Sequence, residues 1–241
     1  MSEKPPKNGL KIQWLGHASL HIETPAGTSI LVDPWFEGNP KYPKGSAPDQ
    51  VDLILVTHGH FDHTGSVVDA AKKTKAQVVG IFELTGILGQ QGVKEAVGMN
   101  IGGSYKVKDV TVTMTEARHS SSIEHKGQAV YAGEPAGFVL EIEGAPTIYI
   151  AGDTAVFSDM KLIAELYRPE IAVLPIGDHF TMGPRQAALA ASFLVPKVIL
   201  PVHWGTFPQL TGAPHQLKEE LSVRGIPSAV EAWQPGGTYP V

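Results

Sequence analysis

The stretch Thr57-His58-Gly59-His60-Phe61-Asp62-His63 (THGHFDH, residues 57–63) decides how this chain is interpreted. It ends the run VDLILVT at 51–57, whose continuous apolar character predicts a buried strand. Three imidazoles and one carboxylate within six residues, directly after such a strand, are more typical of a metal site than of a polar surface turn. The motif therefore predicts metal ligands at the end of a central strand.

The spacing within the motif predicts two binding points. His58 and His60 are two residues apart, so both side chains can turn toward one point where the strand ends. Asp62 and His63 are adjacent and follow a bend, which directs them to a second point about 3.5–4 Å away, the separation found in two-metal sites. Four ligands are too many for one open catalytic zinc, and we interpret the motif as half of a dinuclear site.

The other half is predicted by polar residues that follow three further apolar strands. His119 follows the strand expected at 110–117, Asp153 the strand at 147–151, and His203 the strand at 198–202. Strand ends are where α/β sheets bind ligands. Asp153 is the candidate bridging ligand, because its carboxylate has two oxygens and an anionic charge that offsets the repulsion between two cations. The predicted metal ligands are His58, His60, Asp62, His63, His119, Asp153 and His203.

Four more polar residues follow predicted strands and have two readings each. His17 is either a buried histidine bonded to backbone or a group that contacts substrate or supports a ligand. Asp33 either caps a turn or accepts a hydrogen bond from a ligand histidine. Asp178 and His179 are both candidates for contact with substrate. The alternative for Asp178 is that its carboxylate accepts hydrogen bonds from backbone N–H groups. We predict catalytic roles for Asp62, His17 and Asp178.

The segment 120–137 is long for a loop and rich in Gly, Ser and other polar residues, so we interpret it as a lid or binding loop. Its Tyr131 either touches substrate or packs beneath the loop. Ser120, Ser121 and Ser122 are expected to orient His119 or form a turn, since a site that activates water through metal needs no serine nucleophile.

Composition narrows the function further. The chain has 241 residues, 42% of them hydrophobic, and a formal charge of 19 − 24 = −5, so general nucleic-acid binding is not expected. With no cysteine, disulfides, cysteine nucleophiles and iron–sulfur clusters are excluded, and any metal must be held by His and carboxylates. No apolar run resembles a signal peptide or reaches membrane-spanning length, so we expect a cytoplasmic protein without a membrane partner.

The periodicity predicts one domain over 10–241 after a mobile tail at 1–9. Short β-type runs come first in each half of the chain, and strands alternating with helices follow. Helices are expected at 65–73, 83–91, 158–167, 184–194 and 215–224. This order predicts an α/β fold of two mixed sheets with helices outside.

These residues resemble the metallo-β-lactamase superfamily over nearly the whole chain. The resemblance rests on THGHFDH, on WLGHASLHIE at 14–23, LVDP at 31–34, ARHSSS at 117–122, AGDTAVFSDM at 151–160, PIGDHFTMGP at 175–184 and PVHWGTFP at 201–208. The finer motifs are similar to the bacterial and archaeal "metal-dependent hydrolase" family near the L-ascorbate-6-phosphate lactonases. The resemblance implies a four-layer αββα sandwich with two metals at one edge of the sheets. It also implies that His58, His60 and His119 bind the first metal, Asp62, His63 and His203 the second, and that Asp153 bridges them.

The expected function is hydrolysis of a small ester, lactone or phosphoester by a metal-bridging hydroxide, which Asp62 helps to orient. The expected cofactors are two divalent ions, with zinc first and manganese or iron as alternatives. We expect a small-molecule substrate. The sequence does not decide whether the protein forms a homo-oligomer. The rival hypotheses are a phosphodiesterase or nuclease, for which Lys72, Lys73 and Lys75 form the only dense basic cluster, and a metal-loaded binding module without turnover.

Overall fold

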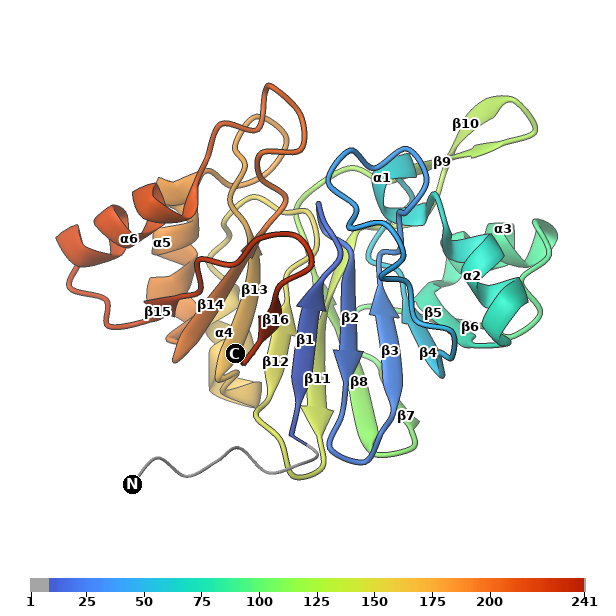
Figure 1. The fold of residues 1–241 in the computed structure, drawn as a ribbon, viewed down its shortest axis with the longest axis horizontal. Coiled ribbons are helices and arrows are strands. Elements are labelled where there is room, and N and C mark those ends of the chain that lie inside the picture. The colour runs from blue at the N-terminus through green and yellow to red at the C-terminus, as the bar shows by residue number, and fades with distance from the viewer. Residues whose placement is uncertain (1–8, 241) are drawn as a thin grey trace.

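Two sheets pack face to face, with helices on both outer sides, in the computed structural model that describes residues 9–240 (Figure 1). This layer order confirms the predicted α/β fold of two mixed sheets with helices outside. Residues 1–8 of the tail predicted at 1–9 lie outside the described part, as does Val241. Within residues 9–240, no helix combines the length and the apolar character needed to cross a membrane.

The first sheet has seven strands in the order β16-β1-β2-β3-β4-β5-β6. The pairs β1–β2 and β2–β3 are antiparallel, and β3 to β6 run parallel. Its strands are β1 (Lys11–Trp14), β2 (Leu20–Glu23), β3 (Ser29–Val32), β4 (Leu53–Leu55), β5 (Gln77–Ile81), β6 (Ala96–Met99) and β16 (Thr238–Tyr239). The helices of this half are α1 (Phe61–Thr64), α2 (Val67–Thr74) and α3 (Phe82–Gln90).

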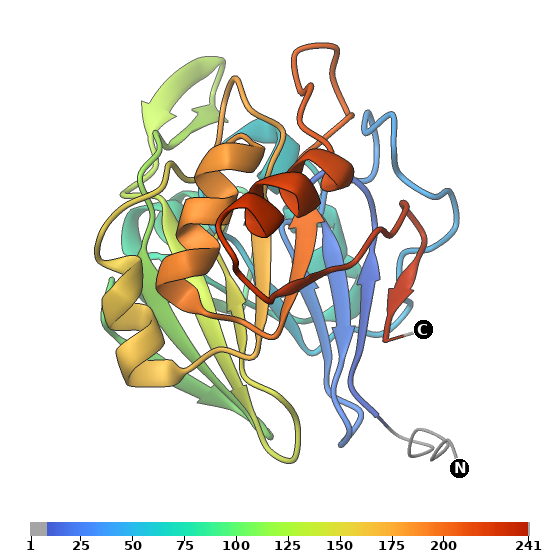
Figure 2. The same cartoon turned by 90° about the vertical axis from the view of Figure 1, so that its left-hand side faces the viewer.

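The second sheet also has seven strands, in the order β15-β14-β13-β12-β11-β8-β7. Its strands are β7 (Ser104–Val107), β8 (Val110–Glu116), β11 (Ala136–Ile142), β12 (Ile148–Ile150), β13 (Ile171–Pro175), β14 (Val198–Val202) and β15 (Ala229–Val230). The helices α4 (Met160–Tyr167), α5 (Pro184–Leu194) and α6 (Pro214–Val223) cover its outer face (Figure 2). A separate hairpin pairs β9 (Ser122–His125) with β10 (Gln128–Tyr131).

Two apolar layers hold these elements in place. One joins side chains of both sheets, among them the buried Ile12, Leu31 and Phe138. The other packs the second sheet against α4–α6, where small residues of α5 such as Ala187 and Ala191 let the helix lie close to the strands. Because the strands are fixed by these layers, the segments that leave β1, β3, β4, β8, β12 and β14 meet at one edge, the upper one in Figure 1.

The hairpin β9–β10 lies inside the segment 120–137, which the sequence analysis interpreted as a loop. Its turn has positive φ at both Lys126 (54°) and Gly127 (77°), the geometry of a tight hairpin turn. Lysine is an unusual residue in that conformation, and most of β10 is exposed, so neither a turn signal nor an apolar alternation marked the strands.

Candidate metal centre

The first group of donor atoms belongs to His58, His60 and His119. His58 and His60 lie in the segment that leaves β4, and His119 follows β8. One side-chain nitrogen from each of the three lies within 4.8 Å of the others, and His58 Nε2 is 3.0 Å from His60 Nδ1. Three imidazole nitrogens that converge in this way can form part of the coordination shell of a transition metal.

The second group contains Asp62, His63 and His203. Asp62 and His63 lie in the short helix α1, which supplies the bend expected after His60. His203 follows β14, and its φ of +55° turns the chain immediately after the strand. Together with His17, these residues place one donor atom each within 4.8 Å of one another.

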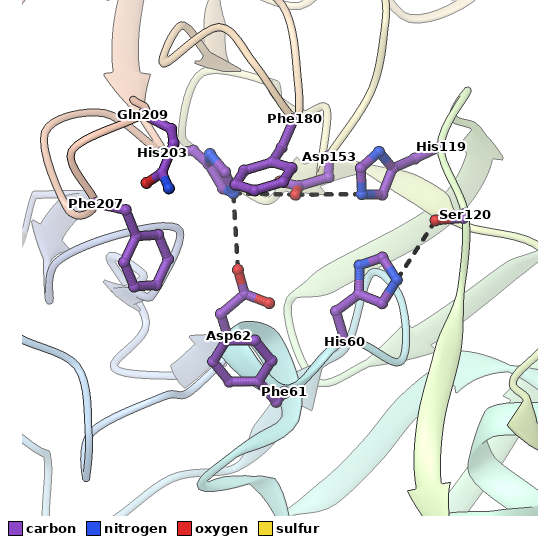
Figure 3. Close-up of a pocket in the computed structure, with 10 residues that line it drawn as sticks. All are labelled: His60, Phe61, Asp62, His119, Ser120, Asp153, Phe180, His203, Phe207 and Gln209. Atoms are coloured by element: carbon purple, nitrogen blue, oxygen red, sulfur yellow. Dashed lines mark hydrogen bonds and ion pairs between the residues drawn. The ribbon is translucent and has the colours of Figure 1, made fainter. Parts of the chain in front are cut away.

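Asp153 lies between the two groups. Its Oδ2 is 3.6 Å from Nε2 of His119 in the first group, and 3.4 and 3.1 Å from Nε2 of His63 and His203 in the second. Figure 3 shows His203, Asp153 and His119 in one row above Asp62 and His60. The structure thus brings all seven predicted ligands together, with one carboxylate oxygen between the two groups.

Several buried atoms of this cluster have no hydrogen-bond partner among the described residues. They include His63 Nε2, His203 Nε2 and Asp153 Oδ1. The two nitrogens approach Asp153 Oδ2, but without the alignment of a hydrogen bond. Buried polar atoms are nearly always paired in folded proteins. Donor atoms that lie close together, some of them buried without a partner, fit a set of residues that holds divalent cations.

The charges of the cluster also favour a bound cation. Burial would lower the pKa of His63, but the carboxylates of Asp153, Asp33 and Asp62 raise it well above its usual value. Burial would raise the pKa of Asp153, but His203 and His63 hold it well below its usual range. Asp153 therefore stays ionised and favours a positive charge at the position of His63 Nε2, where a metal ion would replace a proton.

Asp33 supports both donor groups. Its Oδ2 accepts a hydrogen bond from His63 Nδ1 at 2.8 Å and another from the Thr57 hydroxyl at 2.7 Å. Because that hydroxyl has only one proton, its oxygen accepts from His58 Nδ1, 3.0 Å away. Both histidines thus carry their proton on Nδ1 and present Nε2 to the metal position. The reading of Asp33 as an acceptor for a ligand histidine fits this geometry.

His17 is buried behind Asp62. Its Nε2 lies 2.9 Å from Asp62 Oδ2, and its ring centroid is 4.0 Å from that of His203. Burial and the neighbouring His203 lower the pKa of His17 to about 4. Burial would raise the pKa of Asp62, but His63 and the hydrogen bond from His17 hold it below its usual range. His17 therefore supports an ionised Asp62 from below and does not line the cavity.

Asp178 and His179 are not brought into the cluster. Both are exposed, and the Asp178 carboxylate accepts a hydrogen bond from the His179 backbone N–H at 2.9 Å, as the alternative reading described. Neither residue lines the cavity above the metal ligands; Phe180 of the same loop does. The predicted catalytic role of Asp178 has no support in this geometry.

Two of the serines after His119 contact the segment around His60, whereas the prediction was that they orient His119. Ser120 Oγ lies 3.5 Å from His60 Nε2, and Ser121 Oγ accepts from the Gly59 backbone N–H at 3.2 Å. They therefore position the His58–His60 segment rather than His119. Tyr131 is exposed and donates its hydroxyl proton to Glu134.

A cavity of about 570 Å³ opens above the cluster. Besides metal-ligand candidates and Ser120, it is lined by Phe61, Phe180, Phe207 and Gln209, none of which was predicted (Figure 3). Each lies inside or next to a motif that was singled out, but an aromatic or amide side chain in a loop gives no sequence signal that it faces a cavity. The volume suits a small molecule.

Comparison with known proteins gives consistent matches. The family described as "Beta-lactamase superfamily domain" matches residues 28–204. A UPF0173 metal-dependent hydrolase from Koribacter versatilis is 51% identical over 96% of this chain and 98% of its own, and one from Solibacter usitatus is 48% identical over 94% and 98%. The structure of a metallo hydrolase from Ignicoccus hospitalis has a TM-score of 0.83 and 34% identity, over 95% of this chain and 97% of its own.

Proposed function

The chain belongs to the metallo-β-lactamase superfamily, and we propose that it is a metal-dependent hydrolase with a dinuclear site. In this proposal His58, His60 and His119 hold one ion, Asp62, His63 and His203 hold the other, and Asp153 bridges them. The observation that carries it is the position of Asp153 Oδ2, within 3.6 Å of donor nitrogens from both groups. The reaction is hydrolysis of a small ester, lactone or phosphoester.

Bound divalent ions supply a lowered pKa of water and polarisation of the bond under attack. The protein supplies orientation. Asp62 lines the cavity and stays ionised, so its carboxylate can accept a hydrogen bond from the attacking water and direct it to the substrate. His17 fixes Asp62 through the 2.9 Å hydrogen bond, and Asp33 fixes His63 in the same way.

The donor set contains only imidazole nitrogens and carboxylate oxygens. Such a set suits zinc, manganese and iron, and we propose zinc as the first metal to supply. The lysine cluster on which a nuclease would depend is elsewhere: Lys72 and Lys75 line a different cavity, next to Gly92. Neither lysine lines the cavity at the metal centre, so the basic cluster gives the nuclease hypothesis no support.

The test is the metal content of each chain, by inductively coupled plasma mass spectrometry on protein purified without an affinity tag for metal. About two equivalents of metal support the proposal, and one or none after reconstitution overturns the dinuclear site. His215→Gln is the matched control, because His215 is an exposed histidine at the start of α6 and the content should not change. Absence of turnover by the loaded protein over a broad ester and phosphoester panel would leave only the binding-module hypothesis.

A further inference from the structure

Three phenylalanines surround the mouth of the metal-centre cavity, and we call Phe61, Phe180 and Phe207 the aromatic rim. Phe61 is the first residue of α1, Phe180 lies in the loop between β13 and α5, and Phe207 lies in the loop between β14 and α6. Phe61 and Phe180 are 67% and 51% exposed, and Phe207 is half-buried. Single exposed apolar residues are common on proteins, but three large rings from three segments around one cavity indicate a surface for an apolar ligand.

The rim is held in place from below. The buried Trp35 contacts Phe61 edge-on, with ring centroids 5.6 Å apart, and its ring lies 6.0 Å from that of Phe207. His17 also lies edge-on to Phe207 at 5.6 Å. These contacts order the rings of Phe61 and Phe207 before a ligand arrives, so ordering these two on binding costs little free energy.

The lining offers no cationic side chain to hold a phosphate group. Of the residues that line this cavity in the described chain, none is lysine or arginine, and two, Asp62 and Asp153, carry carboxylates. Phosphate monoesters and nucleotides are normally held by arginine forks, lysines or rows of backbone N–H groups in addition to metal. The neutral polar groups here are Ser120 and Gln209.

We propose that the substrates are uncharged carboxylic esters or lactones with an aryl or similarly bulky apolar group, which the aromatic rim holds. This rests on the hydrolase function proposed above, and it separates carboxylic esters from phosphoesters within that function. In the reaction, the oxygen of water bonds to the acyl carbon and the bond from that carbon to the leaving oxygen breaks. One proton of water goes to the leaving alcohol and the other to solvent, so the products are a carboxylate and an alcohol.

The first arm of the test compares three substrates on the metal-loaded protein: ethyl phenylacetate, ethyl acetate and phenyl phosphate. We expect kcat/KM for ethyl phenylacetate to exceed that for both others by tenfold or more. Phe61→Ala, Phe180→Ala and Phe207→Ala should each reduce the preference for ethyl phenylacetate over ethyl acetate about two- to tenfold, because aromatic contacts contribute in that range. Phe82→Ala is the matched control, since Phe82 is also 67% exposed but lies on α3 and does not line the cavity.

The second arm measures binding without turnover. Benzyl methyl ketone, a neutral analogue of the ester, is titrated by calorimetry into chelator-treated protein. Binding that weakens two- to tenfold in the rim variants, and not in Phe82→Ala, supports the rim as the ligand site. Faster hydrolysis of phenyl phosphate, or an unchanged preference in all three rim variants, would overturn the inference and leave the hydrolase function intact. Rim-dependent ketone binding with no ester or phosphoester hydrolysis would instead overturn the hydrolase function, and the substrate assignment with it.

Discussion

Asp33→Asn should weaken binding of both metal ions, although Asp33 contacts neither ion position directly. The carboxylate accepts three hydrogen bonds, from the Thr57 backbone N–H at 2.8 Å, the Thr57 hydroxyl at 2.7 Å and His63 Nδ1 at 2.8 Å. An asparagine of the same shape has one acceptor oxygen and an NH₂ group that only donates. It cannot satisfy all three donors in either orientation.

The two orientations of the amide differ in consequence. If the NH₂ group faces the Thr57 N–H, one buried donor is left unpaired, which costs about 1–3 kcal/mol of the free energy of unfolding. If it faces His63 and the Thr57 hydroxyl, His63 must move its proton to Nε2, and the hydroxyl proton turns toward His58 Nδ1. His58 and His63 then each present an N–H instead of a lone pair to the metal position. Loss of such support typically lowers metal affinity ten- to hundredfold.

The assay is competition for zinc between the metal-free protein and a chromophoric chelator. We expect both zinc affinities of Asp33→Asn to fall ten- to hundredfold. Thr57→Val keeps the bond from Asp33 to His63 and removes only the hydroxyl, so it should weaken the first ion more than the second. Asp178→Asn, an exposed carboxylate in its own turn, is the matched control. Two wild-type affinities in Asp33→Asn, together with an unchanged free energy of unfolding, would refute the reasoning.

Three further predictions concern single residues. Asp153→Ala should abolish binding of at least one ion and hydrolysis together, and full activity in a metal-depleted variant would contradict the mechanism. The pKa of His17, about 4 in the fold against 6.5 ordinarily, means that the unfolded chain takes up its proton first. As pH falls from about 6.5 to 4, the metal-free protein should therefore lose about 3 kcal/mol of unfolding free energy that His17→Gln does not lose, measured by urea denaturation at each pH. Gly177→Ala places a Cβ onto the carbonyl oxygen of His203, so it should lower the melting temperature and the affinity for the second ion. Gly86→Ala, which meets open space inside α3, should raise the melting temperature slightly and leave the affinity unchanged.

The sequence predicts which ligand candidates lie together, because the signal for them is local. His58, His60, Asp62 and His63 are close in the chain, and the bend they need is supplied by α1. The more distant ligands are predicted by a rule of topology, since strands buried in a sheet deliver their following residues to a shared edge. The predicted helix at 184–194 and the strands at 77–81 and 198–202 have the bounds found in the structure, because a proline begins the helix and apolar runs mark the strands.

The rule that strands deliver their following residues to one edge does not predict which residue of a loop faces the cavity. Asp178 leaves a central strand as predicted, but φ values of +68° and +56° at Asp178 and His179 turn the backbone so that Phe180 lines the cavity. The contact between His17 and Asp62 spans 45 residues and depends on how β1 and α1 meet. Such choices follow from packing across the whole domain, which the sequence pattern does not contain.

The backbone at the metal centre is strained, and this bears on what metal contributes to stability. His17, Asp33 and His203 have φ of +55°, +45° and +55°, a region that costs a residue with a Cβ roughly 1–2 kcal/mol. Hydrogen bonds hold the strained turns, because the His203 N–H donates to the His17 carbonyl and the Ser19 hydroxyl to the Asp33 carbonyl. Each turn brings a polar side chain inward immediately after a strand.

These turns, and the burial of carboxylates beside them, lower the free energy of unfolding. When no ion is bound, only the packing of the two sheets offsets this loss. An ion that binds only the folded chain offsets it by RT ln(1 + [L]/Kd), which is about 4 kcal/mol at a thousandfold excess over Kd. In the proposed dinuclear site, metal binding would therefore stabilise the folded chain.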